Sequence, residues 1–367
     1  MAKLGEVCLI NPKSCTLRDD TEVSFIPMTK VGEHGEFDAS EIKNYSEVKK
    51  GFTNFQNGDI LFAKITPCME NGKGAIAHNM KNGIGFGSTE FHVLRPDTDK
   101  ITSEWLYYLT TWKAFRKEAE RNMTGSAGQK RVPKTFLENY VVNLPDIDTQ
   151  KSENKILRKV DDLIFLRKQQ LAKLDELVKA RFVEMFGDPV SNPMGWKRVR
   201  FDSISENLDS KRVPVTESDR KEGVYPYYGA SGIVDWINDY IFDEDILLVS
   251  EDGANLLMRS TPIAFSVSGK SWVNNHAHVV RFHDFATQKF IEVYFSLIDI
   301  SEYITGTAQP KLNQAKLNTM LFCWPPLSLQ KQFAAFVERV DQQKQTVQQS
   351  LEKLELMKKA LMQEYFG

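Results

Sequence analysis

The chain repeats itself at an offset of 180 residues, and this repeat constrains its fold more than any other feature. A repeat of this length indicates two copies of one structural unit and has to be identified before single elements are assigned. The matching segments are residues 144–150 (LPDIDTQ) with 324–330 (WPPLSLQ), residues 185–187 (MFG) with 365–367 (YFG) and, displaced by one residue, 124–127 (TGSA) with 305–308 (TGTA). The chain therefore consists of a variable region and a long helix, followed by a second variable region and a second long helix.

Each expected helix carries apolar residues at alternating spacings of three and four, the pattern of a coiled-coil seam. The first seam is Leu157, Val160, Ile164, Arg167, Leu171, Leu174, Val178, Arg181 and Met185, and the second is Val337, Val340, Lys344, Val347, Leu351, Leu354, Lys358, Leu361 and Tyr365. The cations within the seams can extend their charge to water, or they can face a groove or a partner. A helix of roughly 36 residues is about 54 Å long. We expect the two helices to pack antiparallel; the alternative is that each packs only on its own domain.

Residues 185–196 (MFGDPVSNPMGW) predict the end of the first helix and a linker, because they combine glycine, two prolines and asparagine. Both regions before the helices read as short strands with glycine-rich turns and one helix each. We expect those helices at Ser103 to Arg121 and at about Gln288 to Tyr303. The expected fold class is α+β, with domains at 1–145 and 188–325 and helices at 146–187 and 326–367.

Composition limits the class of protein without assigning a function. The 367 residues suit two or three domains, and 41% hydrophobic with 26% charged residues is typical of a globular protein. No apolar run is long enough for a membrane span and the start lacks a signal sequence, so we expect a cytoplasmic protein. The four cysteines form no C-x-x-C pair, which disfavours a disulfide framework. A net charge of −2 argues against a uniformly basic surface but permits local phosphate contacts.

Several passages resemble the specificity subunits of type I restriction-modification systems, and the resemblance covers nearly the full chain. The passages are residues 223–232 (GVYPYYGASG), 250–255 (SEDGAN), 272–278 (WVNNHAH), 185–189 (MFGDP), 58–62 (GDILF), 87–91 (GSTEF) and the two Thr-Gly-x-Ala turns. The resemblance implies two target recognition domains, each reading one half of a bipartite site in double-stranded DNA. It also implies an antiparallel pair of helices that docks methyltransferase subunits, two of them in our expectation, and sets the half-site spacing. Restriction and translocase subunits would join through the methyltransferase core.

A DNA-reading surface needs cations for phosphates and polar side chains for base edges. Two turns of the first half offer both; their side chains are Thr124, Ser126, Gln129, Lys130, Arg131 and Lys134 in one, and Lys64, Thr66, Asn71 and Lys73 in the other. The repeated turn of the second half offers Thr305, Thr307, Gln309 and Lys311, and further candidates there are Tyr228, Ser231, Asn255, Lys270, Trp272, Asn274 and Asn275. The resemblance implies that such loops face DNA; the alternative is that they are solvated turns and structural caps.

Other functions find less support in the sequence. His276 and His278 form an H-x-H pair, but no third ligand stands at a convincing spacing, so hydrogen-bonded histidines are the preferred interpretation over zinc. The chain has no G-x-x-x-x-G-K-S/T phosphate loop and no methyl-donor motif. We therefore expect a non-catalytic subunit without a cofactor, with methyl donor and ATP bound only by its partners. The alternatives are a self-sufficient methyltransferase or nuclease and a purely structural scaffold; DNA binding by the isolated chain would separate the scaffold from a recognition subunit.

Overall fold

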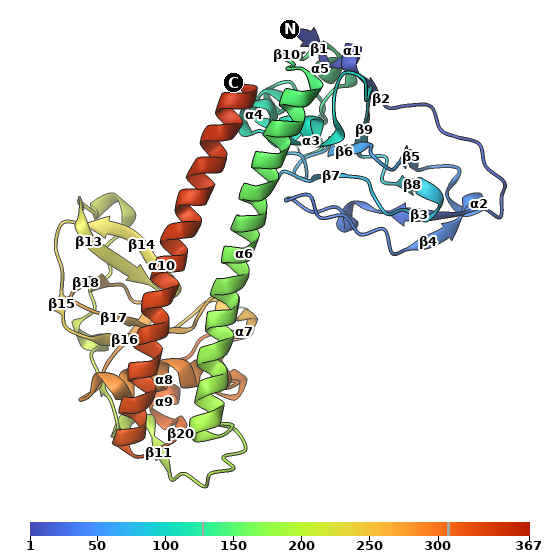
Figure 1. Cartoon of the computed structure of the whole chain (residues 1–367). Coiled ribbons are helices and arrows are strands. Elements are labelled where there is room, and N and C mark those ends of the chain that lie inside the picture. Colours follow the sequence, from blue (N-terminus) through green and yellow to red (C-terminus); the bar gives the residue numbers. More distant parts are fainter. Residues whose placement is uncertain (127, 307–308) are drawn as a thin grey trace. The chain divides into compact units, whose positions relative to one another are not determined.

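The computed structural model describes residues 1–126, 128–306 and 309–367, and the chain separates into two compact units (Figure 1). Unit 1 contains Met1–Leu166 and Leu351–Gly367, and unit 2 contains Arg167–Ser350. Each unit thus contains one globular domain and a part of each of the two long helices. Thr307, one of the expected DNA contacts, lies outside the described residues.

Unit 1 is built on two four-stranded sheets. One has the strand order β2 (Cys8–Ile10), β9 (Phe91–Pro96), β6 (Ile60–Ala63), β7 (Gly74–Ile76), and the other has β4 (Ile42–Asn44), β3 (Glu22–Ile26), β8 (Ile84–Gly87), β5 (Thr53–Gln56). The short strands β1 (Ala2–Lys3) and β10 (Val141–Val142) pair separately. The helices of this domain are α1 (Leu4–Val7), α2 (Tyr45–Val48), α3 (Ser103–Thr111), α4 (Lys113–Arg121) and α5 (Lys134–Asn139).

Unit 2 repeats this topology strand for strand. Its sheets have the orders β12 (Glu206–Asn207), β19 (Ala277–Arg281), β16 (Ile246–Ser250), β17 (Ala264–Val267), and β14 (Gly232–Ile237), β13 (Glu222–Gly229), β18 (Lys270–Val273), β15 (Phe242–Asp243). A third pair joins β11 (Arg198–Arg200) to β20 (Leu321–Cys323), and the helices are α7 (Asn255–Met258), α8 (Phe285–Leu297) and α9 (Gln314–Thr319). A parallel pairing also recurs, β3 with β8 and β13 with β18. The two domains therefore share one fold despite their different sequences.

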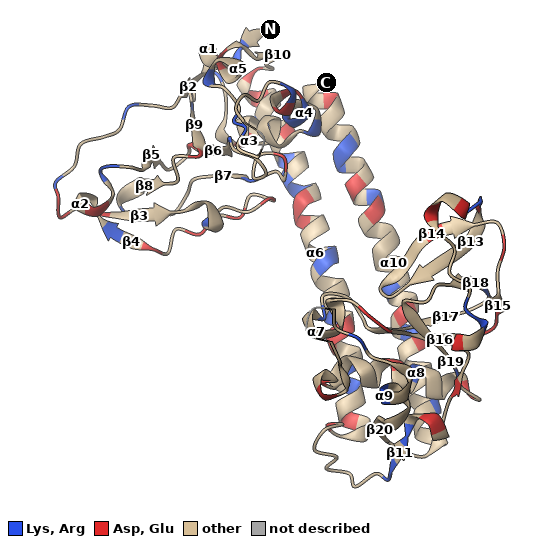
Figure 2. Ribbon diagram, turned by 180° about the vertical axis from the view of Figure 1, so that it is seen from behind, with Lys and Arg blue, Asp and Glu red and all other residues tan. Residues whose placement is uncertain are grey.

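The long helices are α6 (Ile147–Phe186) and α10 (Leu327–Phe366), green and red in Figure 1. They run antiparallel in both units: Asp161 pairs with Lys358 in unit 1, and Asp175 pairs with Lys344 in unit 2, each at 2.6 Å. Every residue of the two expected seams is buried or half-buried. Basic and acidic residues are interspersed along both helices (Figure 2). The seam lysines Lys344 and Lys358 place their ammonium groups on aspartates of the facing helix.

The ends of the long helices belong to the domain cores. Phe186, in the last turn of α6, packs on Phe290 of α8 with ring centroids 4.9 Å apart, within unit 2. Phe366, its repeat partner at the end of α10, packs on Trp105 of α3 at 4.8 Å, within unit 1. Gly187 then ends α6 with a φ of +78°, and a Cβ there would meet Pro193 at 2.7 Å. This explains the glycine that ends the helix in terms of packing.

Two expected helices differ from the observed ones. The single helix expected over Ser103 to Arg121 is broken at Trp112, whose ψ of 128° separates α3 from α4, and whose ring lies 6.3 Å from that of Phe366. The helix expected to reach Tyr303 begins earlier, at Phe285, and ends at Leu297. There Arg259 donates to the carbonyl oxygens of Phe295 and Ile298 at 3.0 and 2.9 Å. Tertiary contacts overrode the local pattern in both places.

Candidate nucleic-acid interface

In unit 1 the two turns selected from the sequence lie against each other. Thr124 and Arg131 close a hairpin through paired backbone hydrogen bonds of 2.9 and 2.8 Å. The amide of Thr66 donates to the carbonyl of Lys130 at 3.1 Å, and Ile65 forms a β-bridge with Arg131. The first hairpin, as we call residues 124–131, and the loop of residues 64–73 therefore form one surface. Gly125 and Gly128 both have positive φ, which suits the tight turn.

The cations of this surface differ in their partners. Arg131 forms a bidentate ion pair with Glu90, with nitrogen–oxygen distances of 2.7 and 2.9 Å, and its hydrogen bonds hold the pKa of Glu90 below its usual value. Lys134 pairs with Glu138 at 3.0 Å. Lys130 is exposed and has no ion pair within the described ranges. Lys130 is thus the side chain of this hairpin best placed to meet a phosphate.

The remaining residues selected in unit 1 are distributed over the same two turns. Thr124, Ser126 and Gln129 are exposed on the first hairpin. In the loop, Asn71 is exposed and Lys64 half-buried, Thr66 Oγ1 donates to Glu70 at 2.9 Å, and Lys73 donates to the Met28 carbonyl at 3.3 Å.

Sequence reasoning missed the residue that supports this loop from below. Arg116 of α4 is buried, and its guanidinium donates to the carbonyl of Met69 at 2.7 Å and that of Lys73 at 3.4 Å. It also lies 5.0 Å from the centre of the Phe62 ring. An arginine on an amphipathic helix gives no sequence signal of this kind, because surface arginines are common on such helices.

Unit 2 forms the equivalent surface from other side chains. Thr305 and Lys311 close the second hairpin, defined as residues 305–311, through two backbone hydrogen bonds of 2.8 Å. Gly253 donates to the carbonyl of Pro310 at 3.0 Å, and Glu251 donates through its amide to the carbonyl of His276 at 2.9 Å. The hairpin, the loop that leads to Asn255 and the turn at 274–276 therefore lie together. Thr305, Gln309, Lys311 and Asn275 are exposed there.

Beneath this surface lies a cluster of charges that the sequence did not reveal. His278 Nδ1 lies 2.6 Å from Asp209 Oδ2 and 3.7 Å from Glu251 Oε2. Arg212 lies 2.7 Å from Glu251 and 3.4 Å from Asp209, and Lys311 lies 3.1 Å from Glu251. Asp209, Glu251 and His278 come close enough to hold a metal ion. The guanidinium and the ammonium already neutralise both carboxylates, so the arrangement is that of an ion-pair network.

The pKa values of the two carboxyls reflect this network. Burial alone would raise the pKa of both groups, but the ion pairs outweigh it and lower them. For Asp209 the largest opposing contribution is the hydrogen bond from His278, and for Glu251 it is the hydrogen bond from Arg212.

Other residues selected in unit 2 support the fold or lie elsewhere. Asn274 is buried and accepts a hydrogen bond from the amide of His276 at 2.8 Å, while Tyr228 is half-buried beside Phe265. Asn255 accepts from Thr261 at 3.0 Å. Ser231 is exposed in the turn between β13 and β14.

Lys270 and Trp272 belong to β18, in the other sheet. Lys270 lies 4.5 Å from the centre of the Tyr240 ring, and Trp272 donates to the Val213 carbonyl at 2.6 Å. Among the described residues, no hydrogen bond joins these two side chains to the second hairpin. Like Tyr228 and Ser231, they belong to the sheet of β13, β14, β15 and β18 and not to the second hairpin.

Comparison with known proteins yields one family. A family model described as the type I restriction modification DNA specificity domain matches residues 1–176 and 193–356. The EcoAI specificity subunit of Escherichia coli is 46% identical over 178 residues, which are 47% of this chain and 30% of that protein. The EcoEI specificity subunit of the same organism is 41% identical over 179 residues, 47% of this chain and 29% of that protein. The match thus spans about a third of the length of these two relatives.

Matches over the full chain are more distant. The putative MjaX specificity subunit of Methanocaldococcus jannaschii is 24% identical over 371 aligned positions, covering 92% of this chain and 83% of that protein. Among solved structures, the S subunit of a type I restriction-modification system from M. genitalium aligns with a TM-score of 0.58 at 12% identity. It covers 100% of this chain and 95% of the other. A chain of another type I R-M system has a TM-score of 0.56 at 16% identity, with coverage of 99% and 96%. These structures share the fold of two domains and paired long helices.

Proposed function

The chain belongs to the family of type I restriction modification DNA specificity domains, and on this premise we propose that it is a sequence-specific DNA-recognition subunit. Each domain, residues 1–145 and 188–325, reads one half of a bipartite target in double-stranded DNA. The helices at 146–187 and 326–367 dock methyltransferase subunits and set the distance between the half-sites. The observation that carries the proposal is the repetition of one strand topology around two hairpins of different chemistry. Two readers of different half-sites need this combination of a shared scaffold and divergent contact residues.

The contacts with DNA divide by chemistry into two kinds. We assign the phosphate contacts to the lysines on or beside the two hairpins, because cations bind the DNA backbone without regard to sequence. These lysines are Lys64, Lys130, Lys134 and Lys311. Base-edge contacts fall to exposed polar side chains, which can pair with specific donors and acceptors in the grooves. In the first hairpin these are Thr124, Ser126 and Gln129, and in the second they are Thr305 and Gln309.

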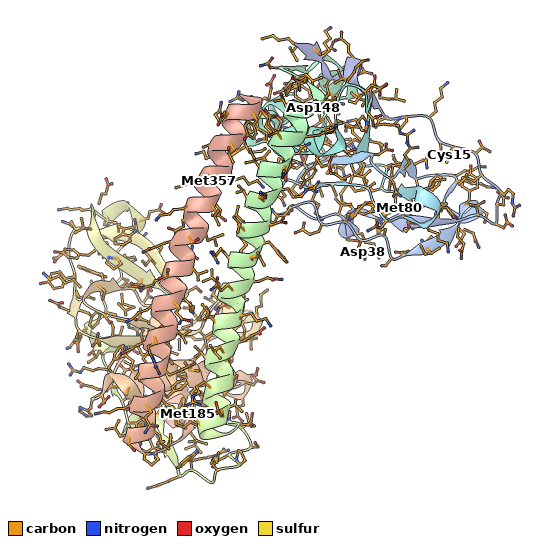
Figure 3. All side chains as sticks on the ribbon, in the orientation of Figure 1. Cys15, Asp38, Met80, Asp148, Met185 and Met357 are labelled. Atoms are coloured by element: carbon orange, nitrogen blue, oxygen red, sulfur yellow. The ribbon has the colours of Figure 1, made fainter. Side chains whose placement is uncertain are left out.

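Exposed apolar side chains on the long helices support the docking role. Leu163, Phe165 and Leu166 on α6 are between 42% and 60% exposed. On the facing helix within unit 1, Leu356 is 67% exposed and Met357, labelled in Figure 3, is 53% exposed. Apolar groups that protrude from a helix pair beyond its seam are typical of a surface covered by another protein. We assign this surface to a methyltransferase subunit.

The remaining parts of the proposal concern chemistry and location. The subunit catalyses no reaction itself, and its partners bind the methyl donor and ATP. Two methyltransferase subunits bind it, and restriction and translocase subunits join through them. Within the described ranges, no helix has the length and apolar character needed to cross a membrane. We place the complex in the cytoplasm, where its DNA target lies.

Genome-wide mapping of adenine methylation tests the proposal. Cells that carry the gene beside its neighbouring methyltransferase gene are compared with cells that lack it. The expected result is a split motif with a fixed non-specific spacer, which disappears on deletion and returns on complementation. Replacing residues 1–145 with those of another family member should change one half of that motif and leave the other intact. A chain that co-purifies with the methyltransferase but leaves methylation unchanged, and that binds no duplex, would contradict the proposal.

A further inference from the structure

In each unit a buried histidine ties the base of the hairpin to the central sheet. His92 of β9 and His278 of β19 are 4% and 1% exposed. Nε2 of His92 lies 2.8 Å from the carbonyl oxygen of Val132, and Nε2 of His278 lies 2.7 Å from that of Leu312. Val132 and Leu312 directly follow the residues that close the two hairpins, Arg131 and Lys311. Because a carbonyl oxygen only accepts, Nε2 carries a proton in both rings.

The second ring nitrogen faces different groups in the two units. In unit 1, Asn11 Oδ1 accepts from the amide of Val93 at 3.0 Å, so the Asn11 Nδ2 group, 2.9 Å from His92 Nδ1, is the donor. Nδ1 of His92 must then accept, which leaves the ring neutral. Burial lowers the pKa of His92, and the charges of Lys64 and Lys134 lower it further.

In unit 2 the side chain that faces Nδ1 is an aspartate, and it comes one residue later than Asn11 does in unit 1, since Leu208 donates to Val279 as Asn11 donates to Val93. Asp209 Oδ1 accepts from the amide of Val279 at 2.8 Å, and Asp209 Oδ2 lies 2.6 Å from His278 Nδ1. Both nitrogens of His278 therefore face oxygens that only accept, so both must be protonated to donate. The pKa of Asp209 lies below its usual value despite burial, because His278 and the amide of Val279 donate hydrogen bonds to it. The geometry is that of an imidazolium ring between two acceptors.

The groups around His278 form a network in which three positive charges, counting the ring, meet two negative charges. Asp209 and Glu251 supply two negative charges, and Arg212 and Lys311 supply two positive charges besides the ring. Lys311 is itself a closing residue of the second hairpin. The network thus fixes the hairpin twice, through the Leu312 carbonyl and through the Lys311 side chain. In unit 1 the position of Glu251 is taken by Lys64, whose carbonyl accepts from Val132 as that of Glu251 accepts from Leu312.

We propose that Asp209 and His278 are a charged pair of positioning residues for the second hairpin, and that Asn11 and His92 are its neutral counterpart for the first. The residue opposite Nδ1, aspartate or asparagine, decides whether the buried ring is charged. For its effect on DNA recognition the inference rests on the proposed function. The pair itself can be tested without DNA.

The first experiment measures the protonation of the rings directly. In the full chain with 15N-labelled histidine, nitrogen chemical shifts at neutral pH should show two protonated nitrogens in His278 and one in His92. H278Q and H92Q assign the signals among the six histidines. In D209N the ring of His278 should lose the Nδ1 proton, because the introduced side-chain amide would donate to that nitrogen, and in N11D the ring of His92 should gain one. A ring nitrogen without a proton in wild-type His278 would overturn the proposal. Should D209N fail to fold, N11D answers the same question in unit 1.

The second experiment tests positioning. Amide hydrogen exchange of Thr305 and Lys311, which close the second hairpin, should accelerate about tenfold in D209A, the order expected when a charged hydrogen bond is lost. Exchange in D209N should stay near the wild-type rate, because the amide still orients the ring. Exchange of Thr124 and Arg131 in unit 1 serves as the internal control. An unchanged rate in D209A would show that the pair does not position the hairpin.

The third experiment connects the pair to recognition. Discrimination against duplexes with a scrambled second half-site should fall about tenfold in D209A relative to the wild type. It should stay near the wild-type value in D209N, and discrimination at the first half-site should be unchanged in both variants. Unchanged discrimination at the second half-site in D209A refutes the role in recognition. If the chain binds no duplex at all, the proposed function fails, while the NMR and exchange results still decide the pair.

Discussion

Gln330 repeats in unit 2 the role that Gln150 has in unit 1: the side-chain amide of each donates to the carbonyl oxygen of the proline five residues before it, at 2.9 Å in both. Both side chains are fully buried. Oε1 of Gln150 accepts from the amide of Thr102, and Oε1 of Gln330 accepts from the hydroxyl of Thr287, so each glutamine joins the start of a long helix to the domain. The repeated glutamines therefore mark the points at which each long helix begins and is attached to its domain.

Removing either glutamine amide should destabilise its own unit. Q150A and Q330A each leave buried polar groups without their partner, which costs about 1–3 kcal/mol. Denaturant unfolding of the full chain, followed by a probe in each unit, measures the loss. Gln343, an exposed residue of α10, supplies the matched control, and Q343A should stay within about 0.5 kcal/mol of the wild type. Equal losses of stability in Q343A and Q330A would contradict the role of Gln330 in attaching the helix to its domain.

The exposed Lys130 should act on DNA affinity and not on sequence preference. K130A removes one phosphate contact, so binding should weaken equally for intact and scrambled first half-sites, and the slope of log affinity against log salt should fall by about 0.9. Titrations at several salt concentrations measure both quantities. K173A, on the exposed face of α6, is the control and should leave the slope unchanged. A change of preferred bases in K130A would instead place this lysine at a base edge.

The neutral state of His92 predicts a pH-dependent stability of unit 1. The folded pKa of His92 is lowered by burial, so the unfolded chain binds the proton more tightly. The contribution of neutral His92 to the stability of unit 1 should be fully present above the unfolded pKa of about 6.5. It should fall as the pH drops from there through the pKa that His92 has in the folded protein. Denaturant unfolding between pH 5 and pH 8 (a range of about three units around the unfolded pKa) measures this loss. H92Q should abolish this part of the pH dependence; a profile identical to that of the wild type would show that other groups cause it.

Lengthening both long helices by one heptad should lengthen the spacer of the DNA target. Seven residues inserted after Leu166 and seven after Ser350 keep the pairs Asp161–Lys358 and Asp175–Lys344 in register. They add about 10 Å of helix, or about three base pairs at roughly 3.4 Å each. Methylation mapping reports the new spacer. Insertion into one helix alone shifts one pair out of register and should reduce stability, which provides the control. An unchanged spacer with the double insertion would refute the role of the helices in spacing.

The repeat and the seam could be read from the sequence because both are local and periodic. A stripe of apolar residues spaced by three and four buries itself along a helix wherever that helix lies. The strands Ile246–Ser250 and Ala277–Arg281 follow the same rule, since short runs of apolar residues bounded by turns are typical of buried strands. Family resemblance then rested on short motifs in the strands and in the turns beside them.

Only the tertiary structure decided how distant residues meet. Asp209 and His278 are 69 positions apart, and Arg116 of α4 contacts Met69 in the loop of residues 64–73, so no local pattern reveals either contact. The break at Trp112 and the end of α8 beside Arg259 likewise depend on packing partners far along the chain. The periodicity of the sequence shows which face of a helix or strand is buried, but not which residues pack against that face. The surroundings of a buried ring depend on those partners, and in the two units of this protein they differ: Asn11 faces Nδ1 of His92, and Asp209 faces Nδ1 of His278.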